Sequence, residues 1–118
     1  MKDFRSLIVW KKVHELTLLV YEITKTFSKE ELYGLTSQLR RAVRSVPTNI
    51  AEGCGRSSAE FRHFLQIAKG SACEVEYLLL LSHELHMTKD SDYEELSKRI
   101  VEVKKMLSSL FAKLKTDR

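Results

Sequence analysis

Apolar residues recur at alternating intervals of three and four positions along most of this 118-residue chain. On an α-helix such spacing places the side chains in one stripe, because the helix repeats every 3.6 residues. The stripes run through four segments separated by short polar stretches, and they predict four amphipathic helices. The chain has only four glycines and one proline, too few of the turn-forming residues that an all-β fold requires.

The first stripe predicts a helix over residues 7–26. The second predicts a short turn and then a main helix over residues 35–53. Pro47 lies inside this second helix, where it removes one backbone donor and leaves the Val43 carbonyl without its usual partner. We therefore expect a kinked second helix that is supported at Pro47 by a neighbouring helix or subunit.

The third segment, residues 57–86, is the longest and carries two apolar stripes, a wider arc than one bundle core needs. We expect part of this helix to contact another subunit. The fourth helix begins near Ser91 and keeps heptad spacing to the carboxyl end. A serine followed three residues later by a glutamate predicts a capping box before each of the last three helices, at Ser28–Glu31, Ser57–Glu60 and Ser91–Glu94.

Short loops between helices of this kind force neighbours to run antiparallel. The sequence thus predicts one all-α domain over residues 1–118, an antiparallel up-down-up-down four-helix bundle whose second helix is kinked at Pro47. The longest apolar run, residues 77–81, is too short to span a membrane, and the amino terminus shows no signal-peptide pattern. Cys54 and Cys73 stand in no metal or redox motif, so we interpret both as small buried residues in a reducing compartment. We expect a cytoplasmic protein without a membrane partner.

Metal catalysis in a helical bundle needs paired Glu-x-x-His motifs. Glu60 and His63 supply one such motif, but no second histidine has a glutamate three positions before it. The chain also lacks the nucleophile and phosphate-loop motifs of common enzyme classes. We expect no enzyme, no metal site and no cofactor.

Polar residues recur at helical spacing beside the apolar stripe of the second helix, and small residues cluster in the middle of the third. A solvated face is one interpretation of the polar row. The other is contact with a neighbouring helix or subunit, which the small residues would let approach closely. For that second interpretation the candidate interface residues are Gln38, Arg41, Asn49, Glu52, Gly70, Ser71 and Glu74, with Glu74 paired to Arg41 or Arg44.

The basic residues are unevenly distributed along the chain. Residues 1–59 carry a net charge of +4, whereas residues 60–118 are neutral overall. A basic surface attracts the phosphates of nucleic acids, and the candidate contacts are Arg40, Arg44, Arg56 and Arg62. The sequence shows neither interleaved aromatic residues for base stacking nor a helix-turn-helix pattern.

Several stretches resemble a known family. Trp10 with its flanking lysine, YGLTSQLRRA at 33–42, SVPTNIAEG at 45–53, GRS at 55–57, and IAKGS at 67–71 followed by Glu74 are similar to the four-helix-bundle family named for reading frames inside 23S rRNA intervening sequences. The resemblance implies an all-helical bundle that assembles as a ring of five. A more distant similarity is to the accessory variability determinant proteins of diversity-generating retroelements, basic pentamers that bind nucleic acid and a reverse transcriptase.

Two functions follow from these observations. The first is a non-enzymatic homopentamer that binds RNA or DNA through its basic surface. The alternative is a scaffold or adaptor for a nucleic-acid enzyme, in which the arginines are structural and the protein itself binds no nucleic acid.

Overall fold

The computed structural model describes residues 3–115, and every regular element in that range is helical. The long helices are α1 (Ile8–Thr24), α2 (Ser37–Cys54), α3 (Ser58–Glu84) and α4 (Asp90–Lys115). Short helical turns lie at η1 (Phe4–Ser6), η2 (Lys29–Glu31) and η3 (Leu32–Thr36). The predicted all-α fold with four helices is confirmed.

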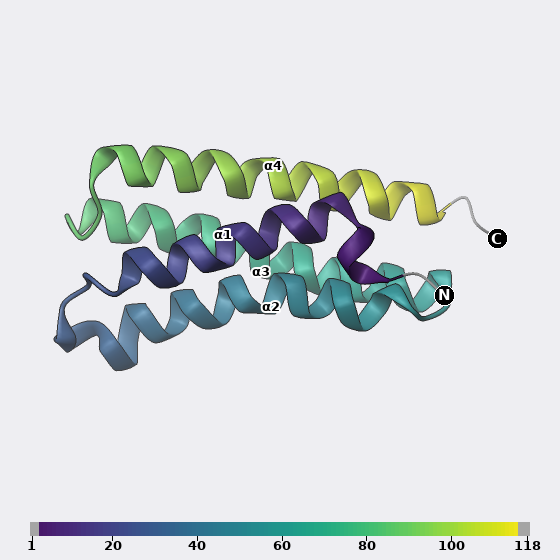
Figure 1. The fold of residues 1–118 in the computed structure, drawn as a ribbon, viewed down its shortest axis with the longest axis horizontal. Coiled ribbons are helices and arrows are strands. Elements are labelled where there is room, and N and C mark those ends of the chain that lie inside the picture. The colour runs from purple at the N-terminus through teal and green to yellow at the C-terminus, as the bar shows by residue number, and fades with distance from the viewer. Residues whose placement is uncertain (1–2, 116–118) are drawn as a thin grey trace.

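The helices pack as a square bundle. α1 and α3 each pack against α2 and α4, so α1 lies diagonally opposite α3. In Figure 1 the α1–α2 and α3–α4 connections lie at one end and the α2–α3 connection at the other, so consecutive helices run in opposite directions. The described chain measures 48 × 23 × 20 Å, which is one helix long and two helices wide in each transverse direction.

The apolar stripes of the sequence form the core of the bundle. Val13 and Leu16 of α1, Val46 of α2 and Ile100 of α4 are fully buried, because a spacing of three or four residues keeps one face of each helix turned inward. Cys54 is buried, but the expectation for Cys73 is wrong, since this residue is exposed. Cys73 directly follows the buried core residue Ala72, and one residue along a helix rotates the side chain by about 100°.

Of the three predicted capping boxes, one forms. Ser57 accepts a hydrogen bond from the Glu60 backbone N–H, and the Glu60 carboxylate accepts one from the Ser57 backbone N–H. This reciprocal pair satisfies two of the donors left free at the start of α3.

The other two predicted boxes do not form. The Ser28 side chain makes no cap hydrogen bond. The Glu31 carboxylate instead accepts a hydrogen bond of 3.0 Å from the Leu35 N–H, on the far side of Gly34, whose backbone is not helical. α4 begins at Asp90, before Ser91, because the Tyr93 N–H already donates to the Lys89 carbonyl. The acidic residues of its first turn favour that start through the helix dipole.

α2 continues through Pro47 as an uninterrupted helix, and the kink itself stays a prediction. The Val43 carbonyl, which loses its intrahelical donor at Pro47, accepts a long hydrogen bond of 3.4 Å from the Thr17 hydroxyl of α1. The same hydroxyl lies 2.7 Å from the Val13 carbonyl of its own helix. Because the Thr17 hydroxyl has one proton, which is shared between these two carbonyls, α1 supplies a weak donor to the Val43 carbonyl.

Replacing Thr17 with valine tests this compensation. We expect Thr17→Val to lower the free energy of unfolding by about 1 kcal/mol, because it leaves the Val43 carbonyl without a donor. Pro47→Ala restores the backbone N–H, so Thr17→Val should cost less in that background. Urea unfolding of both single variants and the double variant measures this coupling, and purely additive effects would contradict it.

Candidate nucleic-acid interface

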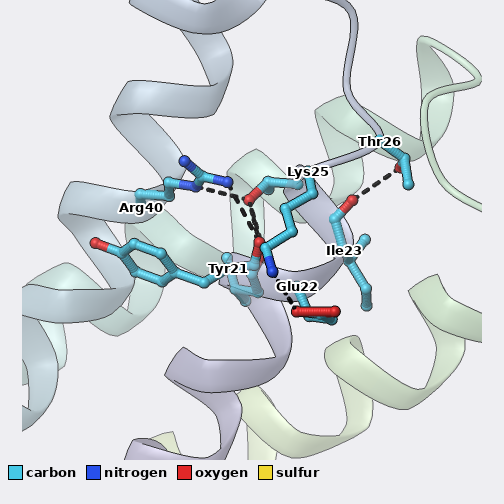
Figure 2. Close-up of polar contacts among 8 residues, drawn as sticks. Tyr21, Glu22, Ile23, Lys25, Thr26 and Arg40 are labelled. Carbon is cyan, nitrogen blue, oxygen red and sulfur yellow. Dashed lines mark hydrogen bonds and ion pairs between the residues drawn. The ribbon is translucent and has the colours of Figure 1, made fainter.

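Arg40 holds the carboxyl end of α1. Its Nε donates to the Thr24 hydroxyl at 2.8 Å, its Nη2 donates to the Tyr21 carbonyl at 3.3 Å, and the guanidinium lies 5.0 Å from the centre of the Tyr21 ring (Figure 2). The last turn of α1 has no basic residue of its own. Arg40 therefore supplies, from α2, the positive charge and donors that a helix end requires.

Arg44 lies one turn further along α2 and contacts the same tyrosine. Its Nη1 donates to the Tyr21 hydroxyl at 2.7 Å, and the side chain is exposed. Unlike Arg40, which is half-buried, Arg44 presents its guanidinium to solvent beside the groove between α1 and α2.

Arg56 lies just beyond α2, at the turn into α3. Its Nε donates to the Glu52 carbonyl at 2.9 Å, its Nη1 lies 3.7 Å from the Glu60 carboxylate, and it covers the Phe64 ring at 5.0 Å. The pKa of Glu60 is lowered, first by the hydrogen bonds from Ser57 and then by the charge of Arg56. Arg56 thus contacts both the end of α2 and the start of α3 and links the two helices.

Arg62 connects α3 with α4. Its guanidinium lies 4.3 Å from the centre of the Phe111 ring, and within the described part of the chain its buried Nε has no hydrogen-bond partner. The four predicted arginines therefore do not form one patch. Two lie between α1 and α2, one at the α2–α3 turn and one against α4, and each makes a contact that links two helices.

The structure brings together part of the predicted polar interface between α2 and α3. Gln38 Nε2 donates to the Glu74 carboxylate at 3.2 Å. The hydroxyls of Ser45 and Ser71 lie 2.9 Å apart, and Asn49 donates to Ser45 at its carbonyl and its hydroxyl. These contacts join the polar row of α2 to the small residues of α3.

Within the chain, the residue that contacts Glu74 is not one of the predicted arginines. Among the described residues Glu74 makes no ion pair with Arg41 or Arg44, and its carboxylate accepts a hydrogen bond from Gln38. Arg41 is exposed and borders a cavity of about 260 Å³ with Ser71 and Glu74, but it makes no hydrogen bond or ion pair within residues 3–114. Its guanidinium is therefore directed to solvent.

Within the described chain no other helix approaches Gly70 closely. It is exposed, and a Cβ atom built on it would meet no described atom within 4 Å. Gly70 belongs instead to an exposed face of α3 that we call the outer stripe. Its members recur at spacings of three and four and are Ile67, Gly70, Glu74, Tyr77, the half-buried Leu81, and Leu85 directly after the end of α3.

An aromatic groove that the sequence did not predict lies between α1 and α2. Phe4, Trp10, His14 and Tyr21 line it together with Arg44, and further lining comes from Thr17, Leu18, Pro47, Thr48, Ala51 and Glu52. Its volume is about 540 Å³, within the range of pockets that bind small molecules. We refer to it as the aromatic groove.

The rings in the aromatic groove contact one another. Trp10 and His14 are stacked, with centroids 4.8 Å apart and planes inclined by 9°. Phe4 meets Trp10 edge to face at 4.8 Å. The spacing of Trp10, His14 and Tyr21 along α1 is helical and was visible in the sequence, whereas the position of Phe4 depends on how η1 folds back against α2.

The described residues show no constellation for metal chemistry. No group of three or more His, Cys, Asp or Glu side chains in this range is arranged to hold a metal ion. His63 packs against the Phe64 ring, and His83 stacks on Tyr93 with Asp90 at 3.5 Å. A bilayer-crossing segment is likewise not found among the helices within residues 3–115.

Comparison with known proteins gives a family match over most of the chain. The family model described as 23S rRNA-intervening sequence protein matches residues 5–109. The structure is similar to the crystal structure of a protein of unknown function from the S23 ribosomal protein family of Bacteroides thetaiotaomicron, with 27% identity and a TM-score of 0.82. That match covers 89% of this chain and 96% of the other. No curated protein matches the sequence.

Proposed function

Because the chain belongs to the 23S rRNA-intervening sequence protein family, we propose that it is a non-enzymatic homo-oligomer, a pentamer, that binds RNA or DNA in the cytoplasm. The observation that carries the proposal is the position of its charge. The whole excess of +4 lies in residues 1–59, which contain α1 and α2, two helices that pack side by side. The half of the chain that contains α1 and α2 is thus basic, with a net +2 on α2 from Arg40, Arg41 and Arg44 against Glu52, while the half that contains α3 and α4 is neutral overall.

Assembly is supported by the outer stripe of α3. Tyr77 is 59% exposed, Leu85 51% and Ile67 41%, and the three lie on one helical face. An exposed apolar stripe next to a glycine is typical of a surface that a second copy covers. Five copies would carry five times the charge of one chain and repeat its basic side around the particle, which strengthens attraction to a polyanion.

A scaffold without nucleic-acid binding is the second candidate. It is favoured by the contacts of Arg40, Arg56 and Arg62, each of which links two helices of the same chain. In that case the exposed guanidinium groups of Arg41 and Arg44 would bind acidic groups of a protein partner.

A salt-dependent titration with duplex DNA or RNA distinguishes the two. We expect binding to weaken with salt, and Arg44→Ala to reduce the slope of log affinity against log salt by about 0.9, the value of one lost phosphate contact on duplex DNA. Arg40→Ala is the matched variant one helical turn away. It should instead lower the free energy of unfolding by about 1–2 kcal/mol, because the end of α1 loses a charged donor.

The proposal also predicts the mass of the oligomer. Light scattering after gel filtration should give the mass of five chains, and a monomer at micromolar concentration would contradict the assembly. An intact oligomer that binds neither RNA nor DNA at 50 mM salt would leave the scaffold as the function.

A further inference from the structure

We propose that the aromatic groove binds unstacked bases of a single-stranded nucleic acid. This inference rests on the proposed function and specifies it, since it assigns the form of nucleic acid and the surface that contacts it. The groove has the three parts that single-strand binding requires, which are aromatic faces, cations beside them and polar atoms at the edge.

The aromatic faces come from the stack of Trp10 and His14. These two planes are nearly parallel, and the His14 side chain is exposed, so the stack ends at solvent. A base placed on His14 would extend the stack by one ring. Phe4 holds the other end by its edge contact with Trp10, which fixes the indole before any ligand binds.

The cations lie at either end of the same aromatic cluster. Arg44 is held by the Tyr21 hydroxyl at 2.7 Å. The Arg5 guanidinium lies 5.3 Å from the centre of the Phe4 ring, next to the groove, and its Nε is paired with the Asp3 carboxylate at 3.1 Å, which leaves its Nη groups for a phosphate. Both belong to the basic half of the chain. Phosphates that flank a stacked base would meet these guanidinium groups, and neither residue belongs to the hydrophobic core.

The polar edge of the groove consists mainly of hydrogen-bond acceptors. Glu52 contributes an exposed carboxylate. The hydroxyl protons of Thr17 and Thr48 already point at backbone carbonyls, that of Thr17 being shared between Val13 and Val43, so their remaining capacity is to accept. Amino and imino N–H groups on base edges match such acceptors, whereas a purely apolar peptide side chain would leave them without donors.

The position of Trp10 allows a direct test, because it is the only tryptophan in the chain. The probes are a mixed-sequence single-stranded 12-mer RNA and the same sequence in a duplex, both titrated at 50 mM salt. We expect the single strand to quench Trp10 fluorescence. His14→Ala should weaken single-strand binding about 5- to 150-fold, the effect of losing one stacked base, while duplex binding stays within about twofold.

Tyr33→Ala is the matched control. Tyr33 is an aromatic residue in η3 that is 93% exposed and lies outside the groove, so its loss should leave both affinities unchanged. His14 is exposed as well, so both variants are expected to fold, which circular dichroism verifies.

Three outcomes would overturn the inference. If the single strand binds without quenching and His14→Ala binds it normally, the groove is not the site, while the proposed function stands. If neither probe binds, the proposed function and the inference both fail. If Trp10 fluorescence changes on dilution of the protein alone and not with RNA, a second copy covers the groove.

Discussion

Gly53→Ala is expected to lower the free energy of unfolding by about 2 kcal/mol, although alanine is the better helix former. Gly53 lies buried in the last turn of α2, where the helix meets the first two turns of α3. A Cβ atom there would stand 2.7 Å from Phe64 Cβ and 2.8 Å from Phe61 Cδ1. Both phenylalanines are held by α3, so the backbone of one helix has to move.

Two opposing terms decide the sign of this effect. Alanine gains about 1 kcal/mol over glycine inside a helix, whereas overpacking a core costs about 1–3 kcal/mol and occasionally more. Because two contacts fall below 3.0 Å, we expect the packing cost to lie at the upper end of its range, about 3 kcal/mol, and to exceed the helix gain by about 2 kcal/mol. The melting temperature should fall by about 6–10 °C, measured by thermal unfolding followed at 222 nm.

Gly70→Ala is the matched control, since it adds the same methyl group to a helix where no described atom lies within 4 Å. It should raise the stability of the single chain by about 0.5–1 kcal/mol. A fall in particle mass for this variant would place Gly70 in the subunit interface. If the Gly53→Ala protein has the same free energy of unfolding as the unmodified protein, the prediction is wrong, because α2 and α3 then move apart at this point without loss of stability.

Ile100→Ala is expected to have the largest effect on stability, a loss of about 2–5 kcal/mol. Ile100 is fully buried in α4 among core side chains of the other helices. Removing most of its side chain forfeits apolar burial and leaves a cavity that four packed helices close only in part.

A graded series checks this prediction. Ile100→Val should cost about 0.5–1.5 kcal/mol, because it removes a single methylene. Leu80→Ala on α3 serves as the surface control, since Leu80 is 39% exposed and lies outside the outer stripe. Urea unfolding gives all three values, and equal losses for Ile100→Ala and Leu80→Ala would contradict the position of the core.

The sequence predicted the core and most helix ends because both depend on nearby residues. α1 was expected over residues 7–26 and extends over Ile8–Thr24, and α2 ends within one residue of Gly53. The capping box at Ser57 formed as predicted, while the one at Ser91 did not, since α4 starts at the preceding residue. Such errors of one or two residues arise because several adjacent polar side chains are able to cap the same helix end.

The sequence alone also determined the number of helices, the buried face of each and the basic character of the first half of the chain. The heptad stripes fix these features through the 3.6-residue period of the helix, and net charge needs no coordinates. Motifs that run in order along the chain likewise predicted that the protein belongs to a known family of four-helix bundles. The family match over residues 5–109 confirms this prediction.

Only the tertiary structure decided what the polar and aromatic side chains contact. Arg40 caps α1 through Thr24, sixteen residues away in the chain, and Glu74 is paired with Gln38 rather than with an arginine. The aromatic groove exists because η1 and α2 place Phe4 and Arg44 beside the rings of α1. These contacts depend on the rotation and register of packed helices, and side-chain spacing along one helix carries no information about its neighbour.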